Sequence, residues 1–126
     1  QSDWYQACTA GDPANRYSCK APCDVTDCNG SSAAIGEVQP VGTVTGCAVP
    51  SEAGGPDIRD LSGNVQEWTN YCSLGTRNSP CNTRGGQFDS GDSALQCGSP
   101  QTSARDRGLA TLGFRCCKDT SASGDL

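Results

Sequence analysis

The chemistry open to this chain is limited by ten cysteines and by the complete absence of histidine. Without an imidazole, neither a Ser-His-Asp nor a Cys-His catalytic unit can form, and the usual general base for neutral pH is missing. Cys19, Cys23 and Cys28 have a loosely zinc-like spacing, but no paired C-x2-C accompanies them. An even number of cysteines in a short chain instead indicates disulfide bonds formed in an oxidising, exported environment.

Two carboxylates bracket a turn in the middle of the chain. Asp60 and Glu67 lie on either side of Ser62-Gly63-Asn64. Calcium is bound in proteins by about six to eight oxygen atoms from carboxylates and carbonyl groups, and a turn of this composition can point alternate carbonyl groups inward. The residues alone favour a simpler interpretation, in which Asp60 caps a turn and Glu67 is a solvated acid beside Trp68.

The composition predicts one small domain that depends on disulfide bonds. The chain has 126 residues, and only 34% of them are hydrophobic, which is little for a self-sufficient core. Each disulfide bond would add about 2–4 kcal/mol to its stability. The net charge of −5 argues against binding to nucleic-acid phosphates. No apolar run approaches the ~20 residues of a transmembrane helix, so no membrane span is expected.

Short elements joined by long loops are expected to position these residues. Residues 4–8 are predicted to form a short helix, and the best-patterned segment is 58–71. Strand-like pieces are expected at 37–39, 41–44, 84–88 and 112–117. Segments 73–83 and 98–108 fit no regular element, and residues 118–126 form a polar tail that we expect to be mobile.

Residues 60–69, DLSGNVQEWT, resemble the D-x-S-G-N-V-x-E-W-T signature of the formylglycine-generating enzyme (sulfatase-modifying factor) family. Further pieces resemble family motifs in the same order: DWYQAC at 3–8, CNG at 28–30, RGG at 84–86 and GFRC at 113–116. The resemblance implies a loop-rich, disulfide-stapled α+β fold, related to C-type lectin-like domains and with little regular secondary structure. Because the chain begins almost at the first motif, residues 1–117 are expected to be the C-terminal portion of the family's domain.

The resemblance also has implications for metal chemistry. In the family the signature wraps a calcium ion, which implies Ca2+ as a cofactor here. The implied ligands are the side chains of Asp60 and Glu67 and the carbonyl groups of Gly63 and Val65. Catalytic members carry two redox cysteines that bind copper, and their places fall near Ser90 and Leu95 in this chain. Since the thiolate pair for Cu(I) is absent, oxidation of a substrate cysteine is not expected.

Three disulfide bonds are expected, the first implied by the resemblance and the other two suggested by loop position. They are Cys8–Cys97, Cys28–Cys47 and Cys72–Cys81. The cysteines left over stand at positions 19, 23, 116 and 117. We expect one of the last two to bond one of the first two. The alternative is a bond to a partner chain that supplies the missing N-terminal part.

These observations predict a function without catalysis. The leading expectation is a calcium-stabilised binding or structural module, secreted or at the cell surface, with a protein or carbohydrate ligand. The alternatives are a formylglycine-generating oxidoreductase or related oxidase, and a subunit of a surface filament. Trp4, Tyr5, Trp68 and Tyr71 could form a platform for stacking on carbohydrate. We expect both tryptophans to lie in the core instead, because the chain is short of apolar residues.

Overall fold

A computed structural model describes residues 2–51, 55–73 and 75–116. The helical elements are α1 (Asp3–Thr9), η1 (Val25–Asp27), η2 (Ser31–Ala33) and α2 (Asp92–Leu95). The strands are β1 (Ala48–Val49), β2 (Ile58–Arg59), β3 (Gln66–Cys72), β4 (Pro80–Arg84), β5 (Gln101–Ala104) and β6 (Leu112–Gly113). The predicted fold class, a loop-rich α+β domain with little regular secondary structure, is confirmed. Within the described residues, no helix is long and apolar enough to cross a membrane.

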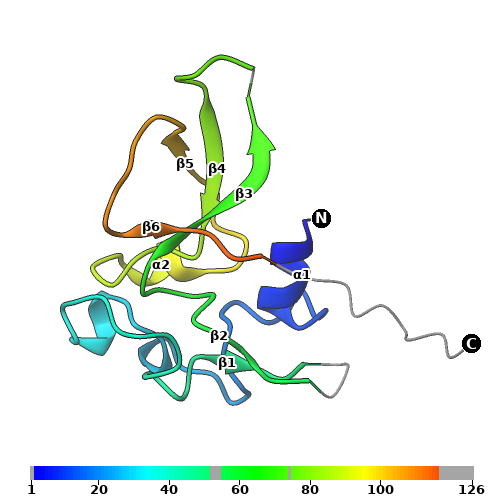
Figure 1. Ribbon diagram of the computed structural model, residues 1–126. Helices are drawn as coiled ribbons and strands as arrows, with labels where there is room; N and C mark the ends of the chain where they lie inside the picture. Colours follow the sequence, from blue (N-terminus) through cyan, green and yellow to red (C-terminus); the bar gives the residue numbers. More distant parts are fainter. Residues whose placement is uncertain (1, 52–54, 74, 117–126) are drawn as a thin grey trace, which may run out of the picture.

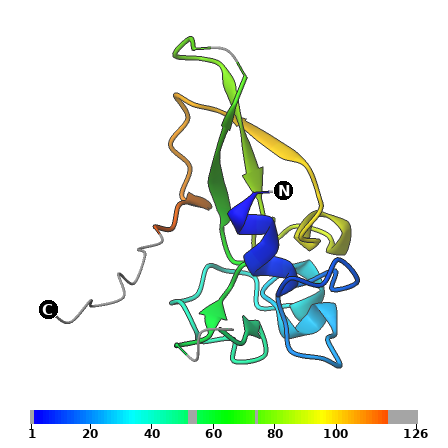
Figure 2. The same cartoon turned by 90° about the vertical axis from the view of Figure 1, so that its right-hand side faces the viewer.

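The main sheet has the strand order β5-β4-β3-β6. β3 pairs antiparallel with β4, which pairs antiparallel with β5, whereas β6 lies parallel to β3. The β3–β4 hairpin projects away from a looped half that contains the two-stranded β1–β2 sheet, and α1 lies beside the base of the hairpin (Figures 1 and 2). The start of β3 is therefore enclosed by β4, β6 and α1.

Several strand expectations were wrong. Residues 37–39 and 41–44 form no strand, because the Thr43 amide donates to the Pro40 carbonyl in a turn and Gly42 adopts a φ of +82°. Of the strand expected at 84–88, only Arg84 lies in a strand, as the last residue of β4, which stops at two glycines with φ of +90° and +68°.

The C-terminal strand is also shorter than expected. Of residues 112–117, the strand includes only Leu112–Gly113. Strands are found, in addition, in segments 73–83 and 98–108, for which the sequence predicted no regular element. Segments 73–83 and 98–108 contain most of β4 and all of β5. β5 lies at the edge of the sheet and has a neighbour on one side only, whereas β4 lies between β5 and β3. Because strand preference depends on such tertiary context, the local sequence did not reveal either strand.

The core consists of two small clusters in which five of the eight buried residues are cysteines. One contains Cys8, Val49, Leu61 and Cys97, and the other contains Cys19, Cys28, Cys47 and Leu95. Trp4 and Tyr5 of α1 pack against the first cluster. Sulfur thus replaces much of the aliphatic volume that the composition lacks, since buried cysteine behaves as a small hydrophobe.

The structure contains the bonds Cys8–Cys97, Cys28–Cys47 and Cys72–Cys81, which are the pairs named from the sequence, and a further bond, Cys19–Cys23. The expectation that Cys19 or Cys23 bonds Cys116 or Cys117 was therefore wrong. The two cysteines lie four positions apart with a Cα–Cα distance of 5.3 Å, and a nearby partner costs little loop-closure entropy. Cys116 is exposed and carries a free thiol. Cys117 and the expected tail at 118–126 lie outside the described residues.

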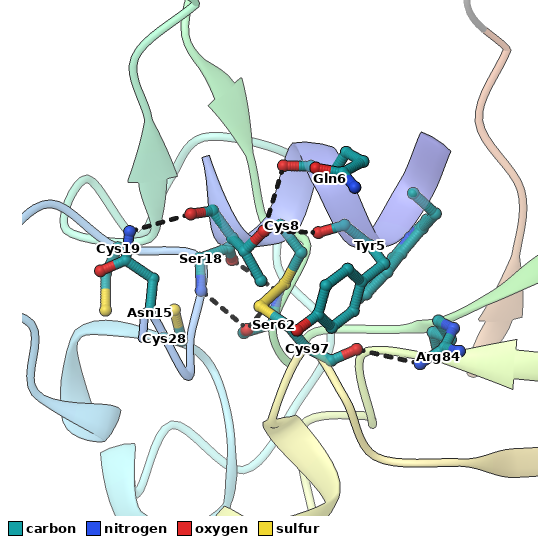
Figure 3. Close-up of a disulfide and its surroundings, with 12 residues drawn as sticks. Tyr5, Gln6, Cys8, Asn15, Ser18, Cys19, Cys28, Ser62, Arg84 and Cys97 are labelled. Atoms are coloured by element: carbon teal, nitrogen blue, oxygen red, sulfur yellow. Dashed lines mark hydrogen bonds between the residues drawn. A yellow bond between two sulfur atoms is a disulfide. The ribbon is translucent and has the colours of Figure 1, made fainter. Parts of the chain in front are cut away.

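The Cys8–Cys97 bond joins α1 to the segment after α2 (Figure 3). Both cysteines are fully buried, and hydrogen bonds hold the Cys97 backbone on both sides. The Arg84 guanidinium donates to the Cys97 carbonyl at 3.0 Å, and the Cys97 amide donates to the Arg16 carbonyl at 2.7 Å. This bond closes most of the chain into one loop.

Removing the Cys8–Cys97 bond is expected to destabilise the protein more than removing Cys72–Cys81. The bonds join residues 89 and 9 positions apart, respectively. Loop entropy then predicts losses of about 4.5 and about 2.5 kcal/mol for the paired alanine variants. Guanidinium unfolding of C8A/C97A and C72A/C81A measures both values. Equal losses would mean that the long bond does not restrict the unfolded chain as proposed.

Candidate functional site

The signature loop, residues 60–67, is fixed by backbone hydrogen bonds to distant segments. The Gly63 amide donates to the Gly85 carbonyl at 2.6 Å, and the Asn64 amide donates to the Asn29 carbonyl at 2.7 Å. Ser62 and Ser18 exchange amide-to-hydroxyl hydrogen bonds of 2.8 and 3.0 Å. The loop is therefore fixed by hydrogen bonds to three other parts of the chain, at Gly85, Asn29 and Ser18.

The Asn64 side chain makes the two hydrogen bonds to the Gln39 backbone that a neighbouring strand would otherwise make. Its Oδ1 accepts from the Gln39 amide at 2.8 Å, and its Nδ2 donates to the Gln39 carbonyl at 3.0 Å. Asn29 Nδ2 donates to the same Oδ1 at 3.1 Å and to the Glu37 carbonyl at 2.9 Å. Asn29 is fully buried, and its own Oδ1 has no hydrogen-bond partner among the described residues. From the sequence, Asn29 opens an N-x-S sequon that could carry a glycan and Asn64 belongs to the expected turn, but neither suggests these buried side-chain contacts.

Glu67 is not the solvated acid that the residues alone suggested. It is 4% exposed. Its Oε2 accepts from the Trp4 indole Nε1 at 2.7 Å, and Arg115 Nε donates to both carboxylate oxygens at 2.9 and 2.7 Å. Arg115 Nη2 donates to Oε1 as well. Each carboxylate oxygen thus accepts two hydrogen bonds, which fills its acceptor capacity.

Asp60 is buried beside this group but has a different partner. Its Oδ2 accepts from the Gly42 amide at 2.6 Å. Burial raises the pKa of the Asp60 carboxyl group, although the Gly42 hydrogen bond and the charges of Arg115 and Arg59 act in the opposite direction. Asp60 also has a φ of +55°, a conformation that a short polar side chain tolerates better than most.

The residues implied as calcium ligands do not fit the ion as they are folded here. Asp60 and Glu67 lie in one loop, but the Glu67 carboxylate is already saturated by Arg115 and Trp4. A calcium ion needs carboxylate oxygens that are free to face it. Within the described residues, no group of three or more His, Cys, Asp or Glu side chains is placed to hold a metal ion.

A hollow of about 720 Å3 opens beside this group, and we call it the Trp pocket. Its apolar wall comes from Trp4, Ile58, Leu61 and Trp68. Its polar lining includes Asp3, Asp57, Arg59, Asn70 and Arg115, and the free Cys116 lies at its edge. The chain's two tryptophans therefore share one pocket. The expectation that both belong to the core holds for Trp4, which packs on the first cluster, whereas Trp68 is a half-buried pocket wall.

The positions assigned to redox cysteines carry no thiol and serve structural roles. Leu95 is fully buried in the second core cluster. Ser90 Oγ accepts from the Gln87 amide at 3.0 Å, and its carbonyl accepts from the Ser31 amide at 3.0 Å. The next cysteine along the chain, Cys97, is bonded to Cys8. No pair of free thiols is found near this segment in the part of the chain that the structure describes.

Gly63→Ala is expected to cost about 3 kcal/mol or more of unfolding free energy. A Cβ there would lie 2.2 Å from the Asn29 carbonyl oxygen, and the residue has a φ of +79°. Overpacking and a left-handed conformation each cost about 1–3 kcal/mol for a non-glycine residue. The control is Gly108→Ala, where a Cβ would meet nothing within 4 Å. Urea unfolding of both variants tests this, and similar midpoints would contradict the tight packing of the signature loop.

Residues 1–120 match the model of the sulfatase-modifying factor enzyme 1-like domain. No curated protein sequence matches the chain. The family match includes α1, the signature loop and β6, which are the elements that meet at Glu67. The chain therefore belongs to the family of sulfatase-modifying factor enzyme 1-like domains.

Proposed function

We propose that this chain is an exported, non-catalytic binding module and that the Trp pocket is its ligand-binding site. The supporting observation is the pocket itself, an open hollow of about 720 Å3 whose lining surface is mostly apolar, with two indole rings and with charged and polar side chains among them. Sites for small ligands in proteins have this character: mostly apolar walls with a few polar groups that fix orientation.

The pocket lining favours a neutral ligand with one apolar face. The two arginines in its lining are already paired, Arg59 with Asp57 and Arg115 with Glu67. A sugar ring combines hydroxyl groups with an apolar face of C–H bonds, so it can rest on an indole while Asn70 and the charged groups bind its hydroxyls. We therefore propose a carbohydrate ligand, and a protein partner is the alternative outcome of the test below.

The absence of catalysis is supported by the Ser90 and Leu95 positions. A thiol at position 95 would be enclosed in the core, since Leu95 has no exposed surface. Thiolates react only where they are ionised and accessible. The chain also lacks histidine, which removes the most common alternative general base.

Export is supported by the disulfide bonds. Four of them join eight of the ten cysteines, and their sulfur atoms form much of the core. Reducing compartments keep such thiols unpaired. A chain with so small an apolar core would lose much of its stability there.

Ligand binding is expected to change the fluorescence of the wild-type protein, because both tryptophans line the Trp pocket. The probes are neutral gluco-, manno- and galacto-oligosaccharides, titrated in the presence and absence of acrylamide as a quencher. At least one series should shift the emission and protect it from quenching. Trp68→Ala should weaken binding at least about tenfold, the equivalent of about 1.4 kcal/mol, with Trp4 as the remaining reporter.

Tyr71→Ala is the matched control for Trp68→Ala. Tyr71 lies on the same strand, is 69% exposed and does not line the Trp pocket, so its removal should leave binding unchanged. If no oligosaccharide protects either tryptophan but an extended peptide does, the ligand is a protein. Equal effects of the two substitutions would place the binding site elsewhere.

The copper-loaded protein is expected not to convert a cysteine-containing sulfatase peptide to formylglycine. The reason is that Ser90 and Leu95 supply no thiolate for Cu(I). Mass spectrometry of the peptide after aerobic incubation detects the conversion directly. A formylglycine product formed in proportion to protein concentration would show that the chain is an enzyme after all.

A further inference from the structure

We propose that the Arg115 guanidinium is the resident cation of the signature loop and that it makes a bound calcium ion unnecessary for folding. This inference concerns how the loop is stabilised and does not depend on the identity of the pocket's ligand. It rests on the contacts of Glu67, which the sequence could not reveal because Arg115 lies 48 positions away.

Arg115 and Glu67 form an ion pair in which the guanidinium donates to both carboxylate oxygens. Arg115 Nε and Nη2 both donate to Glu67, and Nη2 also donates to the Arg59 carbonyl at 3.1 Å. The Glu67 side chain is 6% exposed and the Arg115 side chain is 31% exposed. Paired N–H donors on a guanidinium match the two oxygens of a carboxylate better than any other side chain does.

Burial makes this partnership a requirement for folding. A carboxylate removed from water without a cation or hydrogen bonds is strongly destabilising, so a buried acid in a folded protein must have both. Arg115 supplies the positive charge, and the Trp4 indole supplies the remaining donor at 2.7 Å. No capacity is left on Glu67 for a second cation.

Calcium and Arg115 therefore exclude each other at Glu67. An ion bound by the carboxylate would have to displace the guanidinium, and the displaced positive charge would lie beside the ion and repel it. Displacement would also break the Nη2 bond to the Arg59 carbonyl. The loop is expected to fold equally well in the presence and absence of calcium.

The test compares melting temperatures in millimolar calcium chloride and in EDTA, for the wild type and for two arginine variants. The wild-type Tm should agree between the two conditions to within about 1 °C, because a ligand that does not bind cannot stabilise the fold. Arg115→Met should lower the Tm by about 10 °C, since it leaves a buried carboxylate unpaired. Arg59→Met is the matched control: Arg59 lines the same pocket, but its ion pair with Asp57 is exposed, at 3.4 Å.

A double variant keeps the test informative if Arg115→Met does not fold. Glu67→Gln combined with Arg115→Met removes both charges and should recover a large part of the lost Tm, because the two residues act as a pair. A rise of the wild-type Tm on adding calcium would overturn the proposal, and so would an Arg115→Met variant no less stable than Arg59→Met. Either result leaves the oligosaccharide titration unaffected, so the proposed function is judged separately.

Discussion

The fold depends on satisfying one buried carboxylate. Glu67 has almost no exposed surface, and a charge in that position must be surrounded by hydrogen-bond donors. The donors come from α1, through Trp4, and from the segment after β6, through Arg115. Both residues also line the Trp pocket. The hydrogen bonds that Trp4 and Arg115 donate to Glu67 therefore also fix these two side chains in the lining of the proposed binding site.

In this domain, hydrogen bonds from polar side chains hold loops in place, a role that apolar packing has in larger domains. The Asn64 amide binds both backbone groups of Gln39, and the Ser18–Ser62 pair binds two backbone amides. Such bonds are worth most when they are buried and complete. Together with the disulfide bonds, they allow a chain that is 34% hydrophobic to hold long loops in place. The protein is thus ordered by specific bonds more than by the volume of its core.

The resemblance of five short motifs to a known family predicted the fold class, and the local sequence predicted the position of α1. Local sequence signals failed where a distant residue decides the local structure. Residues 37–39 contain a β-branched residue, but the Asn64 side chain takes the place that a neighbouring strand would occupy. The role of Arg115 was equally hidden, because G-F-R-C reads as a strand ending and its ion pair with Glu67 exists only in three dimensions. Tertiary context overrides propensity in both cases.

Leu95 shows that this domain keeps the family's fold at a position where the redox cysteine is missing. It stands at a place that the resemblance assigns to a redox cysteine, yet it is fully buried among the cysteines of the second cluster. Gly30 packs so closely on it that a Cβ at Gly30 would lie 2.4 Å from Leu95 Cδ2. A thiol there would leave a cavity and would be shielded from substrate. Leu95 therefore belongs to the core, and the recognition surface that we propose is the open Trp pocket, which both tryptophans line.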